Sequence, residues 1–428
     1  MPLRSFSFVI LATSLFLNVS ARPALAVDAA ESDEWTQFLG SHRNAVSSAK
    51  GLNLDWKEKK PKEIWKMPIG GGFSSIACVG DRLYTMVNRD KRDWAVCLDA
   101  GNGKDIWAVD LAPVYRDKQG QGSGPRATPT YDNGRVYCLH PMGDLFCLNA
   151  KDGSEVWKVN IFDESKAKNP AGATFYWGLA GSPLIEGDLV IVQAGGDKDN
   201  AVLALNKDNG KTVWSAGSAP GGFYGSPIAI DAAGRRMIVT ATGSSLIGID
   251  PKKGTELWSH KFGNQVKCSC ATPIWTGDLL FYSAAYGAGA VALEFAKDGD
   301  KVSVKEKWRN THLNNQFATS VVHDGYIYGC DGDLGRCALR CLDLKTGEMK
   351  WEERKPGKCS LIAAEGRLFC MGENGTLRLL ELNPNKYVVK GQLEDLLTYK
   401  TWAAPALAKK RLYVRDEKNV ICLDVSKD

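Results

Sequence analysis

Histidine and net charge are both scarce in this 428-residue sequence, and each shortage excludes a class of function. The histidines share no common spacing, so we expect no histidine cluster that binds a transition metal or activates a nucleophile. They are His42, His140, His260, His312 and His323. The formal net charge is only +5 at pH 7, and the basic residues are dispersed. Nucleic-acid binding normally needs a concentrated basic face, so we expect no nucleic-acid partner.

Long apolar runs are also lacking, except for one near the N-terminus. Arg4 precedes FSFVILATSLFLNV (residues 6–19), and Ala24-Leu25-Ala26 has the small residues of a cleavage site. This combination predicts a secretory signal peptide over residues 1–26. The alternative, a membrane anchor, would need an apolar run of about 20 residues. We therefore expect an exported protein, periplasmic or secreted, whose mature chain has no membrane span.

The twelve cysteines do not form a disulfide pattern in the sequence. Four of them directly precede Leu-Asp or Leu-Asn. In similar stretches elsewhere in the chain the same position holds Ala204, Gly248 or Ala292, which indicates a small buried residue. These four are Cys97, Cys147, Cys341 and Cys422. In VYCLHPMGDLFCL, a two-residue turn would place Cys138 opposite Cys147, so a disulfide there is weighed against two free thiols in contact. Cys268-Ser269-Cys270 has the spacing of a metal or redox pair, but no second pair supports a metal site.

Tryptophan and glycine, by contrast, are plentiful and recur in register. Tryptophan stands at 65, 107, 157, 214, 258, 308 and 351, at intervals of 42 to 57 residues. In five copies a glycine stands four residues earlier, where a tight hairpin turn needs positive φ. These glycines are Gly103, Gly153, Gly210, Gly254 and Gly347. Each copy therefore predicts a strand, a turn and a second strand.

Two further strand signals precede each hairpin. One is a run of residues that favour strands, such as RLYTMV, RVYCLH, LLFYSA or RLYVRD. The other, called here the step, comes before it and is a dipeptide of Ser, Thr or Ala followed by Pro, or by another residue where the proline is missing. The steps are Ser75-Ile76, Thr128-Pro129, Ser182-Pro183, Ser226-Pro227, Thr272-Pro273, Thr319-Ser320, Ser360-Leu361 and Ala404-Pro405. They mark eight units of four strands, and such units bury their faces by stacking in a closed ring. The fold class is therefore predicted as all-β, an eight-bladed β-propeller of four-stranded antiparallel blades.

The chain ends support the count of eight. The last unit stops at ICLDVSKD without a tryptophan strand, whereas EIWKMPI, with Trp65, precedes the first step. We expect this N-terminal strand to complete the last blade and to pair with the strand that holds Cys422. The domain plan is a signal peptide (1–26), an N-terminal extension (27–61) and one propeller (62–428). The recurrent tryptophans could stack on a ligand, but their constant place beside a turn favours packing between blades.

The unit S/T-P…G-x-L/V-Y…L-D-x-x-x-G-x-x-x-W resembles the repeat of pyrroloquinoline-quinone (PQQ)-like propellers. That family includes quinoprotein alcohol dehydrogenases and the propeller lipoprotein of the outer-membrane β-barrel assembly machinery. The resemblance spans about residues 62–428 and implies the fold. It leaves the activity open, because one fold serves many functions.

The resemblance implies two functions. In quinoprotein dehydrogenases that oxidise alcohols or sugars, PQQ lies beside a calcium ion, an aspartate base and usually an adjacent Cys-Cys disulfide. This sequence has no adjacent cysteine pair, so PQQ with calcium is the alternative. The main hypothesis is an exported, non-catalytic and monomeric propeller, without cofactor, that binds a protein, a glycan or a small ligand.

A ring of equivalent positions, two residues before each step, is the candidate binding site. It reads Phe73, Arg126, Ala180, Tyr224, Cys270, Phe317, Lys358 and Trp402. These residues precede the innermost strands, so we expect them near the mouth of the central channel, where aromatics and cations could hold a planar or anionic partner. The alternative is that they only fill the channel. Two inserts, residues 112–126 and 162–181, lie at the same edge, and Tyr176 and Trp177 are their predicted anchors.

Overall fold

The computed structural model describes residue 1 and residues 33–165, 176–196, 198–218, 224–333 and 335–427. The chain divides into two units, Met1–Ser32 and Asp33–Asp428, and the predicted signal peptide lies outside the described residues except for Met1. Within the described part of the chain, no helix has the length and apolar character needed to cross a membrane. All strands assigned among the described residues belong to the second unit.

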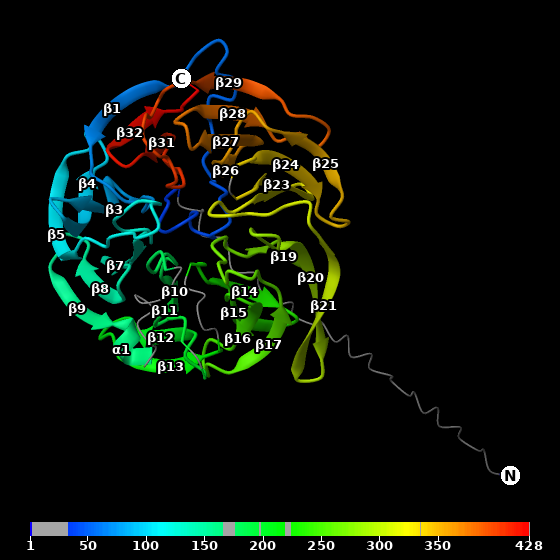
Figure 1. Ribbon diagram of the computed structural model, residues 1–428. Helices are drawn as coiled ribbons and strands as arrows, with labels where there is room; N and C mark the ends of the chain where they lie inside the picture. Colours follow the sequence, from blue (N-terminus) through cyan, green and yellow to red (C-terminus); the bar gives the residue numbers. More distant parts are fainter. Residues whose placement is uncertain (2–32, 166–175, 197, 219–223, 334, 428) are drawn as a thin grey trace. The chain divides into compact units, whose positions relative to one another are not determined.

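This unit is an eight-bladed propeller in which every blade is a four-stranded antiparallel sheet, as the repeat predicted (Figure 1). Strands of one rank occupy one layer of the ring. The innermost layer consists of β2 (Ala77–Val79), β6 (Thr130–Asp132), β10 (Leu184–Glu186), β14 (Ile228–Ala232), β18 (Ile274–Trp275), β22 (Val321–His323), β26 (Cys359–Ala364) and β30 (Ala406–Ala408). The second layer consists of β3 (Arg82–Arg89), β7 (Arg135–Leu139), β11 (Leu189–Gln193), β15 (Arg235–Ala241), β19 (Leu279–Ala284), β23 (Tyr326–Asp331), β27 (Arg367–Gly372) and β31 (Arg411–Arg415).

The two outer layers form the hairpins that the recurrent glycine and tryptophan predicted. The third layer consists of β4 (Arg92–Asp99), β8 (Asp144–Asn149), β12 (Val202–Asn206), β16 (Ser245–Ile249), β20 (Gly289–Asp298), β24 (Ala338–Asp343), β28 (Leu377–Glu381) and β32 (Asn419–Asp424). The outermost consists of β5 (Asp105–Pro113), β9 (Glu155–Asn160), β13 (Thr212–Ala216), β17 (Glu256–Lys261), β21 (Lys301–Asn310), β25 (Met349–Glu353), β29 (Val389–Leu393) and β1 (Lys62–Pro68). One short helix, α1 (Ile161–Ser165), is assigned among the described residues.

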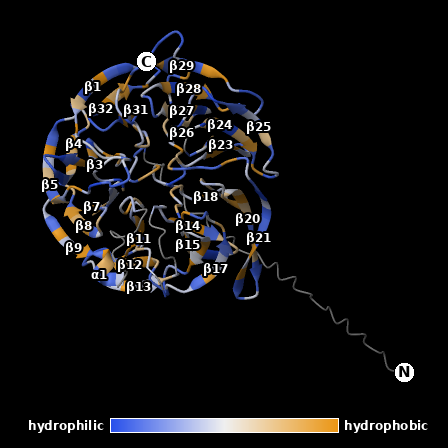
Figure 2. Ribbon diagram, viewed as in Figure 1, coloured by the Kyte–Doolittle hydropathy of each residue, from blue (hydrophilic) through white to orange (hydrophobic). Residues whose placement is uncertain are grey.

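Burial follows the layers because only the outermost strands have a solvent face. The third-layer strand β12 is buried over Val202–Leu205, whereas β5 alternates between buried and exposed side chains. Figure 2 shows hydrophobic (orange) and hydrophilic (blue) residues interspersed along the outer strands. A period of two is what a strand with one solvated face requires.

The ring closes as predicted from the chain ends. Strand β1 pairs antiparallel with β32, and Trp65 lies directly opposite Cys422. Figure 1 shows the blue β1 beside the red β32. The eighth blade therefore joins the first strand of the chain to the last three.

The recurrent tryptophans pack between blades, and most of them also make one specific hydrogen bond. Trp107 Nε1 donates to the Ala150 carbonyl of the next blade at 3.1 Å, and Trp65 Nε1 donates to Ala100 at 3.0 Å. Each indole stands opposite the small residue of the third strand, such as Cys97 beside Trp107. The third-strand residue must be small because the indole occupies the space beside it. A Cβ at Gly248, for example, would lie 2.1 Å from the Trp258 ring nitrogen. The small third-strand residue and the tryptophan opposite it therefore depend on each other.

The seventh blade departs from the repeat, and the chain compensates for the difference. At the tryptophan position of β29 stands Gly391, opposite Leu379. Trp56, from the segment before β1, packs there instead, with its ring centroid 5.8 Å from that of Phe369. A Cβ at Gly391 would lie 2.5 Å from Trp56 Cβ, and Gly391 has a φ of +147°. The indole comes from another part of the chain, and only glycine leaves it room.

Residues 33–61, called here the N-terminal segment, cross the inner strands of several blades. Trp35 forms an antiparallel bridge to Cys78, and Val46 a parallel bridge to Ala363. The Thr36 carbonyl accepts a hydrogen bond from Tyr131 N at 2.9 Å. Ser47 Oγ donates to the Leu407 carbonyl at 3.2 Å. The segment thus contacts β2, β6, β26 and β30, and it satisfies inner-edge groups that would otherwise lack backbone partners.

Arg43 anchors this segment in the interior. Its side chain is buried, and its guanidinium donates to the carbonyls of Ser182 (3.0 Å), Pro227 (3.1 Å) and Pro183. Its Nε also donates to Gln37 Oε1 at 2.8 Å. Burial lowers the pKa of Arg43 to about 9. The guanidinium binds neutral carbonyls of two blades, so it ties the segment to the ring.

The predicted facing of Cys138 and Cys147 is wrong. Cys138 pairs with Phe146, and Cys147 pairs with Tyr137, because three residues, and not two, form the turn between His140 and Asp144. A register change of one residue places the two cysteines on opposite faces of the blade. Both are buried free thiols.

Candidate functional site

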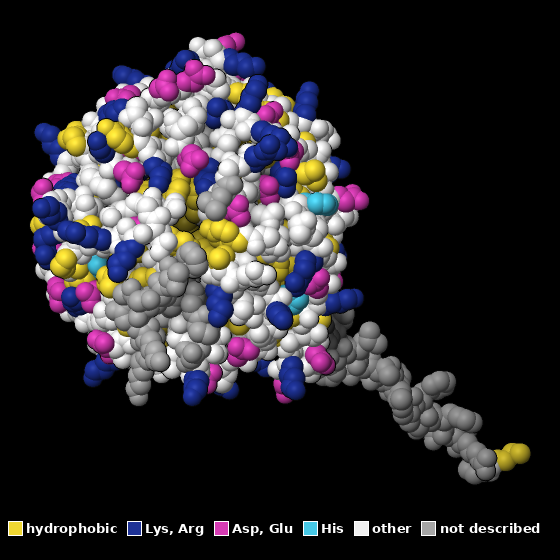
Figure 3. Space-filling model, viewed as in Figure 1, with side chains coloured by type: hydrophobic (Ala, Val, Ile, Leu, Met, Phe, Trp, Pro, Cys, Tyr) yellow, Lys and Arg dark blue, Asp and Glu magenta, His cyan; other side chains and the backbone are white. Residues whose placement is uncertain are grey.

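A cavity of about 450 Å³ opens at the channel end where the innermost strands begin. Seven of the eight predicted ring positions line it: Phe73, Arg126, Ala180, Tyr224, Cys270, Phe317 and Trp402. The lining is mainly apolar, and Figure 3 shows a hollow with hydrophobic side chains near the centre of this face. Charged side chains of both signs are spread around it. We call this space the mouth cavity.

One wall of the mouth cavity is a stack of three aromatic rings. Trp402 lies between Phe73 and Phe317, with centroid distances of 5.2 and 5.1 Å. Its indole Nε1 donates to Glu373 Oε2 at 2.9 Å, which fixes the orientation of the ring. Such stacks stabilise by about 0.5–1.5 kcal/mol for each pair beyond simple burial. The wall is therefore formed before any ligand arrives.

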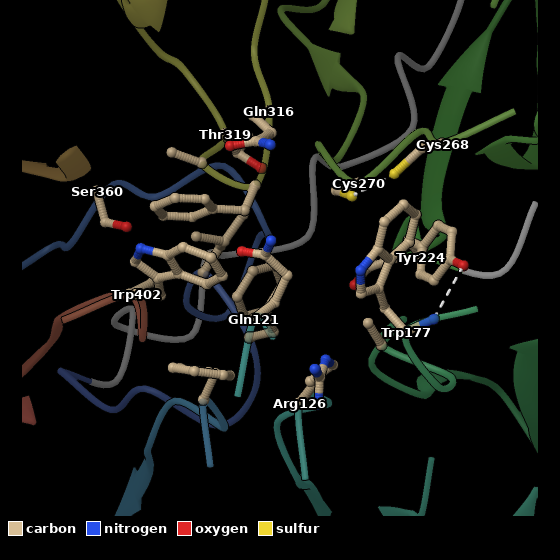
Figure 4. Close-up of a pocket in the computed structure, with 18 of the residues that line it drawn as sticks. Gln121, Arg126, Trp177, Tyr224, Cys268, Cys270, Gln316, Thr319, Ser360 and Trp402 are labelled. Carbon is tan, nitrogen blue, oxygen red and sulfur yellow. Dashed lines mark hydrogen bonds between the residues drawn. The ribbon is translucent and has the colours of Figure 1, made fainter. Parts of the chain in front are cut away.

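The opposite wall is formed by Trp177 and Tyr224, whose centroids are 5.7 Å apart in an edge-to-face arrangement. Figure 4 shows them across the cavity from Trp402. The Tyr224 hydroxyl accepts a hydrogen bond from Trp177 N at 3.4 Å. Desolvation raises the pKa of Tyr224, so this phenol stays neutral.

Tyr176, predicted as an anchor beside Trp177, is not among the lining residues. It is buried, and its hydroxyl donates to the Pro141 carbonyl at 2.7 Å. Its own carbonyl accepts a hydrogen bond from Tyr115 at 2.8 Å. Consecutive residues of an extended chain point to opposite sides, so only one of the two aromatics reaches the cavity.

The insert at residues 112–126 forms the edge of the cavity between the two walls. Arg126 donates to the carbonyls of Gly122 (2.7 Å) and Gly124 (2.9 Å), and its guanidinium lies over the rings of Tyr115 and Phe73. Burial lowers the pKa of Arg126. Two of its donors bind carbonyls of the loop, so Arg126 shapes the edge, and only its remaining surface faces a ligand.

Lys358 is the one predicted ring position that does not line the cavity, and it lies behind the aromatic stack. Its Nζ is 5.4 Å from the Trp402 ring centroid and donates to Gln316 Oε1 at 2.7 Å. Lys400, which sequence reasoning missed, lies 4.4 Å from the same ring and donates to the Gln121 carbonyl at 2.9 Å. Both ammonium groups donate hydrogen bonds to neutral oxygens, and both lie within cation–π distance of Trp402.

Several lining residues carry no repeat signal. Gln119 and Gln121 come from the insert, Gln316 precedes a ring position, and Phe38 and Leu39 belong to the N-terminal segment. Phe38 and Leu39 close the cavity on the side of that segment. None could be aligned with a repeat, although the length of the insert indicated that it would reach the channel.

The donor chemistry of the cavity does not fit PQQ with calcium. The described lining residues offer amides, hydroxyls, thiols and one guanidinium but no carboxylate, whereas calcium sites use carboxylate and amide oxygens together. Among the residues the structure describes, no three His, Cys, Asp or Glu side chains are grouped to hold a metal ion. Paired carboxylates, as a glycoside hydrolase requires, are likewise missing from the described lining.

The proteins of known sequence that resemble this chain include BamB proteins and quinoprotein dehydrogenases. A family model described as outer membrane protein assembly factor BamB matches residues 91–353. The BamB protein of Moranella endobia is 21% identical over 369 residues, covering 83% of this chain and 78% of that protein. The quinoprotein ethanol dehydrogenase of Pseudomonas aeruginosa is 26% identical over 307 residues, covering 64% of this chain but only 46% of that enzyme.

A solved structure confirms the architecture. The quinohemoprotein alcohol dehydrogenase of Comamonas testosteroni superposes with a TM-score of 0.64 over 92% of this chain and 81% of that one, at 13% identity. At that identity the likeness establishes the fold alone.

Proposed function

The chain belongs to the family described as outer membrane protein assembly factor BamB, and from this premise we propose that it is a non-catalytic protein-binding module. In this proposal the chain is exported, takes part in outer membrane protein assembly, and holds a segment of a partner protein in the mouth cavity. The family membership supplies the partner class, and the geometry of the cavity supplies the site.

The facing aromatic walls carry the proposal. Trp402, stacked between Phe73 and Phe317, faces Trp177 across a mainly apolar cavity. Tryptophan and tyrosine are the residues that most often dominate protein interfaces, because each buries a large area with little loss of side-chain entropy. A cavity of about 450 Å³ has room for one or two large side chains of a partner.

The polar groups around these walls suit a peptide. Gln119, Gln121 and Gln316 bring amide groups to the edge of the cavity. Amide side chains both donate and accept hydrogen bonds, as an extended backbone requires. We therefore expect a partner segment to place apolar side chains between the walls and its backbone against the amides.

A second candidate is a quinoprotein dehydrogenase, which the likeness to the Pseudomonas aeruginosa enzyme favours. The lining residues that the structure describes do not support it, since they offer no carboxylate for a calcium ion or for a general base. Aromatic walls of this kind can also stack on a glycan.

Photo-crosslinking in the native host tests the main proposal. A photoreactive phenylalanine analogue replaces Gln121 at the cavity, or, as the control, Ile106, which is 42% exposed on outer strand β5. We expect the Gln121 position to cross-link an outer-membrane assembly protein, and Trp402→Ala in the same chain to reduce that product about tenfold or more. Equal cross-linking from Ile106, or products unchanged by Trp402→Ala, would show that the mouth cavity is not the binding site.

Titration with PQQ and Ca²⁺ tests the second candidate. The purified chain is mixed with both, and dye reduction is followed with alcohols and sugars as substrates. We expect no saturable quinone binding and no turnover. Stoichiometric uptake with turnover would replace the protein-binding proposal by the dehydrogenase.

A further inference from the structure

Two thiols on the wall of the mouth cavity are in direct contact. The Sγ atoms of Cys268 and Cys270 are 3.4 Å apart, and both residues line the cavity. Cys268 is 5% exposed, and Cys270 is partly exposed. No other cysteine occurs among the described lining residues, whereas Cys138 and Cys359, for example, are completely buried. Their access to the cavity therefore sets the two thiols apart from the buried cysteines.

The segment that holds the pair is positioned by one asparagine and not by sheet pairing. Asn264 Nδ2 donates to the carbonyls of Cys268 (2.6 Å) and Ala285 (3.1 Å), and Asn264 Oδ1 accepts from Cys268 N at 3.0 Å. The following inner strand, β18, has only two residues. A disulfide requires the two sulfurs to approach to about 2.0 Å, and a segment without ladder hydrogen bonds can make that movement.

The two sulfurs are not equivalent. The pKa of Cys268 is raised, mainly by its hydrogen bond with Cys270 and to a smaller extent by desolvation. Cys268 therefore keeps its proton, while Cys270 is the sulfur that an occupant of the cavity meets first. This asymmetry, one accessible sulfur and one shielded partner, is the arrangement that thiol–disulfide exchange uses.

We propose that Cys268 and Cys270 form a thiol–disulfide exchange site whose substrate is a disulfide, or a pair of thiols, in an apolar peptide segment. The aromatic walls select the apolar segment, and the sulfurs lie at its side (Figure 4). The site does not depend on the assembly role proposed above, because any disulfide that enters the cavity can test it.

The exchange balances without an external oxidant. The Cys270 thiolate attacks one sulfur of the incoming disulfide, a mixed disulfide forms, and the other substrate sulfur leaves as a thiolate. The Cys268 sulfur then attacks Cys270, and the second substrate thiolate leaves. The protons of the two cysteines pass to the departing thiolates, so the substrate is reduced to two thiols while Cys268–Cys270 becomes a disulfide. In the reverse direction the oxidised pair makes a disulfide in the substrate. A ring closed over one intervening residue is strained, and strained disulfides are the more oxidising ones.

The aromatic disulfide 5,5′-dithiobis(2-nitrobenzoate) serves as the probe on the folded, full-length chain. We expect the wild type to release two nitrothiobenzoates and retain no label, with the Cys268–Cys270 disulfide found by peptide mass mapping. Cys268→Ser should release one and retain one on Cys270, because no resolving sulfur remains. Cys270→Ser should react about tenfold more slowly, and Cys138→Ala, the matched control at a buried thiol, should behave as the wild type.

Other outcomes decide against the site. Labels retained on both cysteines of the wild type would show that the pair does not close. Equal rates for Cys270→Ser and the wild type, or reaction only after unfolding, would show that the sulfurs are not accessible. If the serine variants do not fold, as judged by circular dichroism, mass mapping of the wild type in glutathione redox buffers decides alone: a Cys268–Cys270 disulfide supports the site, and its absence under oxidising buffer refutes it. The cross-linking result is unaffected in every case.

Discussion

The N-terminal segment and the mouth cavity use tryptophan and arginine in opposite ways. In the segment, Trp35 is 1% exposed and Arg43 is 2% exposed, and Arg43 donates to carbonyls of two blades. At the cavity, Trp402 is only partly buried, and Arg126 donates to its own loop. The aromatic and polar groups of the segment are buried against the blades, whereas the cavity exposes aromatic surface that a partner can contact. The comparison separates residues that maintain the fold from those that could bind a partner.

The largest effect should follow from Trp35→Ala in the N-terminal segment. The side chain is completely buried and packs in the core that includes Leu39 and Cys78. Removing a buried tryptophan leaves a cavity, so we expect a loss of about 3–5 kcal/mol in the free energy of unfolding. Urea unfolding followed by fluorescence measures it. A loss below about 1 kcal/mol would mean that the segment is dispensable and that the comparison fails.

A smaller loss should follow from Arg43→Met. The substitution leaves the carbonyls of Ser182 and Pro227 without these donors, and each buried unsatisfied group costs about 1–3 kcal/mol. Because burying the guanidinium is itself costly, we expect a net loss of about 2–4 kcal/mol in the same urea assay. Arg43→Lys, which keeps a donor, should fall between the wild type and Arg43→Met. Equal stability of Arg43→Met and the wild type would remove the anchoring role.

Trp402→Ala, the matched change at the mouth cavity, should cost less stability. The ring is partly exposed. It loses its stacking on Phe73 and Phe317, a hydrogen bond to Glu373 and its contacts with two lysines, all partly solvated, so we expect about 1–2 kcal/mol. Its main effect should be on cross-linking from Gln121. Thermal unfolding and the cross-linking assay are read on the same preparation. A stability loss as large as that of Trp35→Ala would assign Trp402 to the fold instead of to binding.

The smallest effect should come from Lys358→Met behind the aromatic stack. The lysine contributes a cation–π contact and a hydrogen bond to Gln316, both partly solvated, so we expect a change within about 0.5–1 kcal/mol. If cross-linking from Gln121 falls as strongly as in Trp402→Ala, the partner segment carries an acidic group that meets this lysine.

Much of the architecture was predictable because each blade repeats the same physical solution. A small residue in the third strand and a tryptophan opposite it recur in seven copies, and five of these also have the turn glycine, so the copies reinforce one another. The seventh blade was the exception. Its tryptophan position holds Gly391, and no local pattern indicates that Trp56 fills it from a different segment. The register of Cys138 was missed for a related reason, since turn length depends on the backbone of a few residues after His140.

The site was predictable only where it follows the repeat. Phe73, Tyr224, Phe317 and Trp402 share one position per blade, and the ring brings those positions together. Phe38, Gln121 and Lys400 reach the same cavity or its wall from segments without a counterpart in other blades. Their placement depends on the course of single loops, which carries no periodic signal.

The sequence by itself determined the number of blades, the closure of the ring by Trp65 beside Cys422, and the ring of positions around the mouth, because these follow from a repeated local pattern. Only the tertiary structure decided the path of the N-terminal segment, the replacement of a missing tryptophan by Trp56, and the contact between Cys268 and Cys270 on the cavity wall. These depend on close packing between residues from unrelated parts of the chain and on the path of single loops, for which the order of residues provides no spacing rule.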